Sequence, residues 1–311
     1  MNHQIAMPMG ELPKFSIVTP SYNQGHFLEE TILSVLNQRY PHTEYIIVDG
    51  GSTDSSVEVI KRYESKLAWW VSEKDRGQAH AINKGLERVT GDIVAYLNSD
   101  DVFLPGAFDM VAKIFMERPH INWLAGNCIL FGNAAEACVK YPTPAADIAS
   151  WLHFNRLPQQ STFWRRSVMQ KHGLFEEKFR YSFDYEYWVR LVHGGERCET
   201  VDFPLAGFRL HPQSKTVAEG THFAGEDKAF RDHYLAKMKP EEVRSFELME
   251  RNGKTFALFA KAVELKSAGK SSEAWDCFTK AVKGNPAALG TRVGMGCLRR
   301  LFRAAPKSPA A

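Results

Sequence analysis

Short apolar runs alternate with stretches of helical apolar spacing through the first hundred residues. Residues 93–97 have the length and side-chain branching of a buried strand. Similar runs and the helix-spaced stretches between them lie, in order, at 15–19, 27–38, 44–48, 56–63, 67–71 and 79–89. Because strands alternate with helices, we expect an α/β fold with a parallel sheet and helices on both of its faces.

The second half of the chain contains fewer strand-like runs and ends in helices. Pro105 marks the start of a helix just after the fourth strand. Further strands are expected at 122–125, 128–131, 159–164 and 205–209, and a further helix at 183–191. Beyond Thr221 the composition becomes helical, which predicts a separate all-α extension.

Charged side chains follow three of the predicted parallel strands. They are, strand by strand, Asp49 with Asp54, Asp75 with Arg76, and Asp100 with Asp101. The loops after parallel strands leave the same edge of the sheet, where open α/β sheets bind ligands. Adjacent carboxylates there favour a hard divalent cation, which also binds phosphate oxygens. Each pair alone is equally typical of turns and helix caps, so only their convergence indicates a site.

The bulk composition narrows the function classes. The 311 residues carry a net charge of +3, too small to indicate a nucleic-acid partner. The five cysteines lack any C-x-x-C spacing, which favours a reducing compartment over disulfides or zinc. Neither a secretory signal nor a bilayer-length apolar stretch is recognisable, so we expect a cytoplasmic protein, attached at most peripherally to the inner membrane face. The phosphate-binding signatures of dinucleotide enzymes and P-loop NTPases are absent.

Four motifs in the first half resemble those of family 2 glycosyltransferases, in the order typical of that family. They are Thr19-Pro20-Ser21-Tyr22-Asn23, Val48 to Asp54, Asp75-Arg76-Gly77-Gln78 with Asn83-Lys84-Gly85, and Asn98-Ser99-Asp100-Asp101. The resemblance covers roughly residues 14–216. It implies a GT-A fold that binds a nucleotide-diphosphate sugar through a divalent cation, Mn²⁺ or Mg²⁺, and transfers the sugar with inversion.

The resemblance also assigns candidate residues to the donor side of the site. The nucleotide-sugar candidates are Pro20, Tyr22, Asn23, Asp49, Asp54, Asp75, Arg76, Gln78, Asn83, Asn98 and Ser99. Asp100 corresponds to the chief metal-contacting residue of the D-x-D motif, and Asn98 stands where many relatives have its first aspartate. His211, near the end of the domain, is the second metal candidate, although a lone histidine is as often structural.

The acceptor side is expected to come from the second half. The resemblance places a general base just before an aromatic-rich helix, and Asp184 matches that position, with Glu186 as the fallback. Such a group is needed because an acceptor hydroxyl attacks poorly until its proton is removed. The strand-like segment 159–164 offers Gln160 and Trp164 as acceptor-side candidates, although aromatic residues there also suit a core.

The C-terminal extension shows two further patterns. Gly269, Ala274, Phe278, Ala281 and Pro286 fall at the offsets of a tetratricopeptide repeat, and the resemblance covers one repeat, about 255–288. One repeat cannot bury its own face, so we expect it to pack on its neighbours or to mediate self-association. Residues 291–303 combine four arginines with apolar positions, which suits either a helix on an anionic membrane surface or a docked helix with solvated arginines.

These patterns divide the chain into an N-terminal tail, a glycosyltransferase domain and a helical extension. The boundaries expected are 1–13 for the tail, 14–220 for the domain (14–104 nucleotide-sugar half, 105–220 acceptor half), 221–303 for the extension and 304–311 for a disordered tail. The expected activity is inverting transfer from a UDP-sugar, or a GDP- or dTDP-sugar, to a glycan or glycolipid acceptor in surface polysaccharide assembly.

Two alternatives remain at this point. A sugar nucleotidyltransferase has a similar fold but needs a basic, glycine-rich triphosphate loop, and residues 21–26 lack the basic side chains. A catalytically idle scaffold that binds nucleotide sugar is the other alternative. The presence of both Asp100 and Asp184 speaks against it, and release of nucleoside diphosphate separates the two hypotheses.

Overall fold

The computed structural model describes residues 12–133, 136–219 and 222–302. Residues 1–11 of the expected N-terminal tail and the tail expected at 304–311 lie outside the described residues. The chain forms two compact units that divide between Tyr234 and Leu235. Each unit is described by itself.

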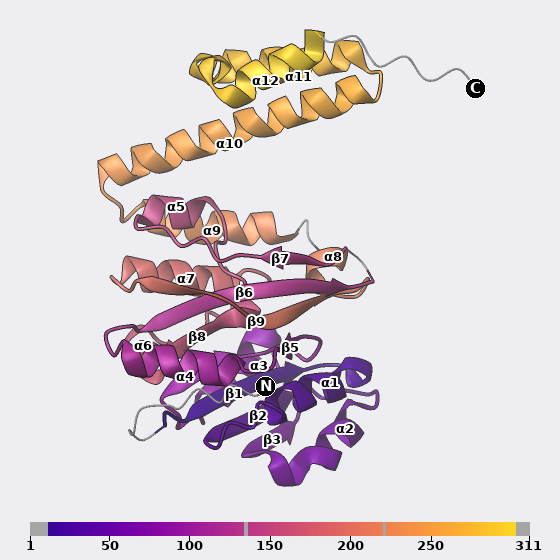
Figure 1. Cartoon of the computed structure of the whole chain (residues 1–311), viewed down its shortest axis with the longest axis vertical. Helices are drawn as coiled ribbons and strands as arrows, with labels where there is room; N and C mark the ends of the chain where they lie inside the picture. The colour runs from indigo at the N-terminus through magenta and orange to yellow at the C-terminus, as the bar shows by residue number, and fades with distance from the viewer. Residues whose placement is uncertain (1–11, 134–135, 220–221, 303–311) are drawn as a thin grey trace, which may run out of the picture. The chain divides into compact units, whose positions relative to one another are not determined.

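The first unit begins with four parallel strands and the helices between them (Figure 1). The strands are β1 (Phe15–Ser21), β2 (Thr43–Asp49), β3 (Trp69–Ser72) and β4 (Ile93–Tyr96), and they pair in parallel in the order β3-β2-β1-β4. The connections carry α1 (Gly25–Leu36), α2 (Ser56–Tyr63) with the 3-10 turn η1 (Glu64–Lys66), and α3 (Gln78–Leu86). Ser21, Asp49 and Ser72 lie in register, so these strands end at one edge of the sheet.

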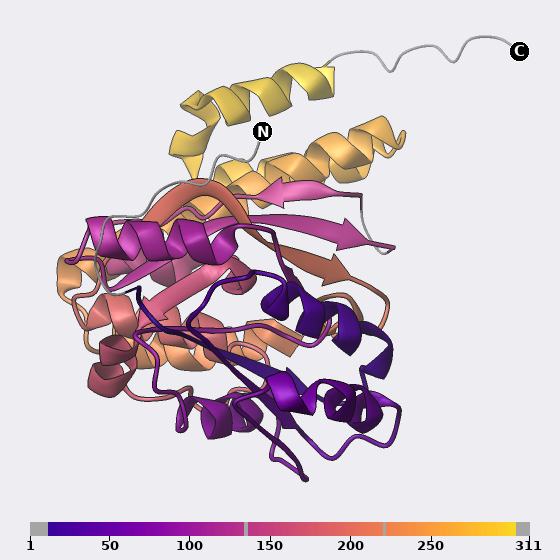
Figure 2. The same ribbon diagram turned by 60° about the horizontal axis from the view of Figure 1, so that its bottom comes forward.

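The remaining strands continue the sheet with mixed directions (Figure 2). Beyond β4 the order is β8 (Thr162–Arg165), β6 (Trp123–Gly132), β9 (Cys198–Leu210) and β5 (Val102–Phe103), and β7 (Cys138–Lys140) pairs with β6. β8 is antiparallel to both of its neighbours, whereas β6 and β9 are parallel. The α/β fold class is therefore confirmed, with the parallel character concentrated in the first half.

The two short strands expected around Gly126 are one continuous strand, β6. A Cβ atom at Gly126 would lie 2.5 Å from the side chain of Leu205 and 2.8 Å from the carbonyl oxygen of Phe203. The missing side chain lets β9 pass close to β6, and the pairing register shifts at this point without ending the strand. Thus Gly126 accommodates an irregularity and does not form a turn.

Apolar and aromatic side chains fill the space between the sheet and its helices. Those helices are α4 (Ala107–Glu117), α5 (Ile148–His153), α6 (Arg166–His172), α7 (Phe183–His193), α8 (Lys215–Ala218) and α9 (Phe223–Leu235), with a 3-10 turn η2 (Gln159–Ser161) before β8. Phe15 of β1 stacks on Phe108 of α4 at 4.6 Å, and Trp123 of β6 stacks on Trp188 of α7 at 5.4 Å. Phe230 of α9 is buried against Tyr185 of α7, so α9 packs within the first unit.

The second unit is helical. It consists of α10 (Pro240–Ser267), α11 (Ser271–Gly284), the 3-10 turn η4 (Pro286–Gly290) and α12 (Arg292–Phe302). The tetratricopeptide positions Ala274, Phe278 and Ala281 are buried with Phe259 of α10 and Leu301 of α12 in one apolar cluster. Among the described residues, the helices are too short or too polar to cross a membrane.

Candidate active site

A cleft of about 760 Å³ opens at the carboxyl ends of the parallel strands. Ten of the predicted site residues line it: Pro20, Tyr22, Asp75, Arg76, Gln78, Asn98, Ser99, Asp100, Gln160 and Asp184. Side chains from α7, α8 and β7 line it as well, so the cleft joins the two halves of the sequence. Of the six charged residues that were expected to converge at the strand ends, Asp75, Arg76 and Asp100 line the cleft, whereas Asp49, Asp54 and Asp101 do not.

Asp100 and His211 form a close pair beside the cleft. The Asp100 Oδ2 atom lies 3.0 Å from His211 Nε2, and both side chains are nearly buried. Gln24 of the loop after β1 donates to the same Oδ2 atom at 3.3 Å. His211 follows β9 directly, so antiparallel pairing of β9 with β5 brings it back to the loop after β4. The described residues contain no group of three or more His, Cys, Asp or Glu side chains arranged to hold a metal ion.

Asp101, the neighbour of Asp100, points into the protein and is fully buried. Its carboxylate accepts hydrogen bonds from the Arg209 backbone at 2.9 Å, from Gln160 at 3.1 Å and from Asn98 at 3.2 Å. Burial and the nearby Asp100 charge raise the pKa of Asp101 well above its ordinary value, although these hydrogen bonds oppose the rise. Asp101 therefore fixes the loop, and Asp100 alone of the pair lines the cleft.

Asn98 lies in a chain of side-chain amides that ends at a lysine. Gln78 Nε2 donates to Asn98 Oδ1 at 2.6 Å, and Lys215 Nζ donates to Gln78 Oε1 at 2.7 Å. Lys215 also donates to the carbonyl oxygen of Arg180 at 3.2 Å. Burial, and secondarily the charge of Arg180, lowers the pKa of Lys215. Lys215 lines the cleft, and sequence reasoning missed it because no motif links it to Gln78, 137 residues earlier.

Asp184 lies in the first turn of α7, on the cleft wall formed by the second half. Its Oδ1 atom accepts a hydrogen bond from the Tyr185 backbone at 2.7 Å. Burial raises the pKa of Asp184 to about 6, and the Asp227 carboxylate contributes to the rise, whereas the Tyr185 hydrogen bond and the Lys140 charge oppose it. A carboxyl group with this pKa is half ionised at about pH 6 and mostly ionised at neutral pH, as a general base requires. Glu186, the fallback base, is buried and bonded to Arg190 and Tyr234.

The loop after β2 is held together by its own polar side chains. Asp49 is fully buried and accepts hydrogen bonds from the backbones of Gly51 and Ser52 and from the Ser72 hydroxyl. Asp54 accepts hydrogen bonds from the backbones of Gly25 and Ser56, at the starts of α1 and α2. Neither carboxylate lines the cleft.

Four other candidates also lie outside the cleft lining: His211, described above, and Asn23, Asn83 and Trp164. Asn23 adopts a positive φ of 52° and accepts a hydrogen bond from the Thr53 backbone. Asn83 exchanges two hydrogen bonds with the backbone of Phe175. Trp164 is fully buried, 5.7 Å from Trp188, so its ring packs in the core. These residues order the walls behind the cleft.

The loop after β3 also lines the cleft, through Asp75 and Arg76. Arg76 donates to Glu177 through Nε and a terminal nitrogen, at 3.0 and 2.8 Å, which links this loop to the second half of the unit. Asp75 caps its own turn by accepting from the Gly77 backbone at 2.8 Å. A Cβ atom at Gly50 would lie 2.5 Å from the Asp75 carboxylate, so the missing side chain allows the two loops to approach.

Comparison with known proteins agrees with this architecture. Residues 16–127 match the family model described as glycosyl transferase family 2. This segment of the chain is therefore similar to family 2 glycosyltransferases. The match covers β1 to β4 and therefore the loops that carry Asn98 to Asp101.

Two curated glycosyltransferases illustrate the similarity. A putative teichuronic acid biosynthesis glycosyltransferase, TuaG of Bacillus subtilis, is 40% identical over 109 residues, which are 34% of this chain and 43% of the relative. This chain therefore spans less than half of the length of that relative. An uncharacterized glycosyltransferase of Mycobacterium tuberculosis is 29% identical over 217 residues, 67% of this chain and 82% of the relative.

Solved structures extend the similarity beyond the family match. The mannosyltransferase PcManGT from Pyrobaculum calidifontis, in complex with GDP-Man and Mn²⁺, superimposes with a TM-score of 0.59 at 17% identity and covers 96% of this chain and 86% of its own. S. aureus TarS 1–349 in complex with UDP-GlcNAc superimposes with a TM-score of 0.56 at 17% identity, covering 94% and 82%. At this identity the similarity is one of fold, and it confirms the GT-A fold.

Proposed function

We propose that this protein is a family 2 glycosyltransferase that transfers a sugar from a nucleoside-diphosphate sugar to an acceptor hydroxyl, with inversion at the anomeric carbon. The observation that carries the proposal is that one cleft is lined by Asp100, which is paired with His211, and by Asp184, a carboxyl group whose burial raises its pKa to about 6. The cleft volume of about 760 Å³ is in the range of small-molecule sites.

The residues at Asp100 fit the divalent cation that the family implies. The Asp100 carboxylate offers the oxygen ligand that Mn²⁺ and Mg²⁺ prefer, and phosphates would complete the coordination. His211 Nε2, 3.0 Å from Asp100 Oδ2, would add a nitrogen ligand. PcManGT, a neighbour in fold, has a structure with GDP-Man and Mn²⁺. When bound, the cation would supply Lewis-acid neutralisation of the departing diphosphate.

Asp184 is the proposed general base. The acceptor oxygen forms its bond to the anomeric carbon while the bond from that carbon to the diphosphate oxygen breaks. The proton of the acceptor hydroxyl passes to the Asp184 carboxylate, and the nucleoside diphosphate leaves with the electron pair. An attack from the face opposite the leaving group inverts the anomeric configuration.

Lys215 is the proposed diphosphate contact from the second half of the unit. Its ammonium group is largely removed from water, and its hydrogen-bond acceptors in the described part of the chain are neutral: Gln78 Oε1 and the Arg180 carbonyl oxygen. A buried cation without a bonded carboxylate favours an anionic ligand. We expect Lys215→Met to weaken nucleoside-diphosphate binding about tenfold and Lys215→Arg to restore part of it, whereas Lys74→Met, also at the cleft, has a smaller effect.

The donor and acceptor classes follow from chemistry shared with the relatives. TarS and PcManGT have structures with UDP-GlcNAc and GDP-Man, so we propose a UDP-sugar donor first, with GDP- and dTDP-sugars as alternatives. The name of TuaG refers to teichuronic acid biosynthesis, and we propose a glycan or glycolipid acceptor in surface polysaccharide assembly.

The first test is a thermal-shift panel of UDP, GDP, dTDP and CDP, each with and without Mn²⁺. A nucleotide that binds only the folded state raises the melting temperature, so one stabilising nucleotide identifies the donor class. Stabilisation that needs Mn²⁺ supports Asp100 and His211 as ligands. The absence of any shift at millimolar nucleotide with Mn²⁺ would contradict the proposal.

The second test separates catalysis from binding. We expect Asp184→Asn to reduce release of nucleoside diphosphate from the matching donor about 10²–10⁴-fold, the usual contribution of a general base. The thermal shift with nucleotide should be unchanged, since Asp184 is assigned to the acceptor side. Wild-type protein that binds the donor but releases no diphosphate with any glycan acceptor would favour the idle scaffold.

A further inference from the structure

Charge is unevenly divided between the two units. Residues 235–311 contain 15 lysines and arginines and 7 acidic residues, a net charge of +8. Residues 1–234 contain 24 lysines and arginines and 29 acidic residues, a net charge of −5. The small net charge of the whole chain therefore conceals a strongly basic helical unit.

Part of this basic charge lies exposed on α12. Gly294, Cys297 and Leu301 of this helix are buried within the second unit, and their positions define one face. Arg292 and Arg299 lie seven residues apart on the opposite face, and Arg300 lies beside them. All three arginines are exposed.

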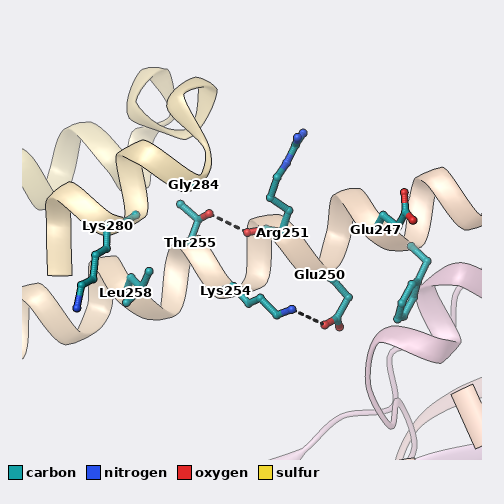
Figure 3. A pocket seen from close by; sticks show the side chains of 10 residues that line it. Glu247, Glu250, Arg251, Lys254, Thr255, Leu258, Lys280 and Gly284 are labelled. Carbon is teal, nitrogen blue, oxygen red and sulfur yellow. Dashed lines mark hydrogen bonds and ion pairs between the residues drawn. The ribbon is translucent and has the colours of Figure 1, made fainter. Parts of the chain in front are cut away.

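Within the described part of the chain, the arginines of α12 have no acidic partner, in contrast to three lysines of the same unit, Lys254, Lys261 and Lys270. Lys254, Lys261 and Lys270 lie 3.9, 3.3 and 3.7 Å from Glu250, Glu264 and Glu273, respectively. Figure 3 shows Lys254 pointing along α10 toward Glu250, beside a groove of about 530 Å³ that contains both acidic and basic side chains. Within residues 12–133, 136–219 and 222–302, the α12 arginines make no ion pair or side-chain hydrogen bond.

Exposed apolar side chains flank the arginines. Met295 is 40% exposed and Phe302 is 73% exposed, and both lie on one side of the arginine row. The Phe302 ring contacts the half-buried Trp275 of α11 at 5.1 Å. Arginines beside exposed aromatic and apolar side chains are typical of surfaces that bind at a lipid–water interface, where rings enter the headgroup region.

We propose that the arginine face of α12, formed by Arg292, Arg299 and Arg300 with Met295 and Phe302, binds an anionic lipid surface. Complementary charge selects the anionic headgroups, and the apolar side chains leave water on contact. A nucleic acid would use the arginines and leave Met295 and Phe302 in water. An acidic surface on a second copy of the chain would use them in the same way, so both are rival outcomes of the test.

The test is co-sedimentation of the full chain with vesicles of phosphatidylcholine alone and of equal parts phosphatidylcholine and phosphatidylglycerol. We expect binding to the anionic vesicles only, and its loss at 1 M salt, where the screening length is about 3 Å. The triple variant Arg292→Gln, Arg299→Gln, Arg300→Gln should lower the partition coefficient about a hundredfold, because each basic residue near an anionic surface contributes about fivefold.

A matched variant keeps the test specific. Lys254→Gln, Lys261→Gln, Lys270→Gln removes the same charge from the same unit at ion-paired positions and should change binding much less. Phe302→Ser should weaken binding about tenfold, and Leu248→Ser, at another exposed apolar position, should not. Melting temperatures of all variants check that they are folded.

Several results would overturn the proposal. These are equal binding to neutral vesicles, no binding to either kind, or equal losses in the two triple variants. Self-association that the arginine variant abolishes, without any vesicle binding, would assign the face to a second copy. Tighter binding to a homopolymeric RNA than to anionic vesicles, unaffected by Phe302→Ser, would assign it to nucleic acid. None of these results bears on the proposed transferase activity.

Discussion

The loops after β2 and β4 carry the same kind of residues but use them differently. Both follow buried parallel strands at one edge of the sheet, and both contain two aspartates. In the loop after β2, Asp49 and Asp54 accept hydrogen bonds from backbone N–H groups of nearby turns and helix starts. In the loop after β4, Asp101 performs that structural role and leaves Asp100 at the cleft, paired with His211.

The difference shows what decides whether a strand-end aspartate can serve a ligand. A carboxylate whose oxygens already meet backbone and hydroxyl donors has little capacity left for a ligand, as Asp49 demonstrates with four such hydrogen bonds. Among the residues that the structure describes, the Asp100 carboxylate has a glutamine amide and a histidine nitrogen as its only side-chain partners. The two adjacent aspartates lie in a turn after β4, and their hydrogen-bond partners separate their roles: Asp101 is held inward by the Arg209 backbone, whereas Asp100 faces His211.

Among the variants that test this difference between the two loops, we expect the largest effect at Asp100. We expect Asp100→Asn to lower turnover roughly a hundredfold or more, comparable to losing a group that stabilises developing charge. The variant should also lose the Mn²⁺-dependent part of the thermal shift with nucleotide. Its melting temperature without ligand should stay within a few degrees of wild type, because Asp100 holds little of the loop. A large loss of stability without ligand would make Asp100 a structural residue like Asp49.

The sequence predicts the regular parts of the fold because they depend on local patterns. The apolar run 93–97 became β4, and the segment 56–63 became α2 with the expected bounds. The short strand β5 was not anticipated, because two residues, Val102 and Phe103, carry no periodicity and form a strand only by pairing with β9. Long-range pairing of this kind is invisible in a single sequence.

The same limit applies to the site. The motifs located Asp100 and Asp184, since each has a recognisable strand or helix beside it. They did not show that Trp164 is enclosed by other aromatic rings, or that Lys215 meets Gln78, because both facts depend on packing between distant segments. The direction of a polar side chain after a strand is likewise set by its hydrogen-bond partners, as Asn83 and Phe175 illustrate.

The next effect concerns pH and Asp184. With the pKa of this carboxyl at about 6, turnover should rise about tenfold per pH unit up to about pH 6 and then level off. The charged groups around it are Lys140, Asp227 and Lys215. Because Lys140→Met removes an opposing positive charge, it should move the inflection to higher pH. An inflection near the ordinary pKa of a free carboxyl would argue that Asp184 is not the base.

The pH dependence of the protein's stability provides a second test of the Asp184 pKa, and this test needs no substrate. The folded state holds the Asp184 proton up to about pH 6, whereas the unfolded state loses it near its ordinary pKa of 3.8. Wild-type stability therefore falls as pH rises through this window, and Asp184→Asn removes that loss. We expect the variant to gain more in melting temperature, relative to wild type, at pH 7 than at pH 4.

We expect a third effect at Asp49, whose carboxylate holds the loop after β2. Asp49→Asn places an amide N–H₂ among the N–H groups of Gly51 and Ser52, and we expect it to lower the free energy of unfolding by about 1–3 kcal/mol. Denaturant titration measures the loss. Ser72→Ala removes one donor and should cost less. If Asp49→Asn weakened nucleotide binding strongly at unchanged stability, Asp49 would belong with Asp100 as a ligand-facing residue.

The smallest effect is expected at Asp54, which bridges the starts of α1 and α2. Its two oxygens accept from the Gly25 and Ser56 backbones, both at 2.9 Å. Asp54→Ala should lower stability by about 1 kcal/mol, as for other capping residues, and should lower the melting temperature by a few degrees. Asp54→Asn retains an acceptor oxygen and should cost less. Because the carboxylate lies outside the cleft lining, the nucleotide-induced thermal shift should survive in both variants. Loss of that shift would mean that the cap positions the loop after β1 for the donor. Both loops would then contribute to donor binding, the loop after β4 by direct contact and the loop after β2 from a greater distance.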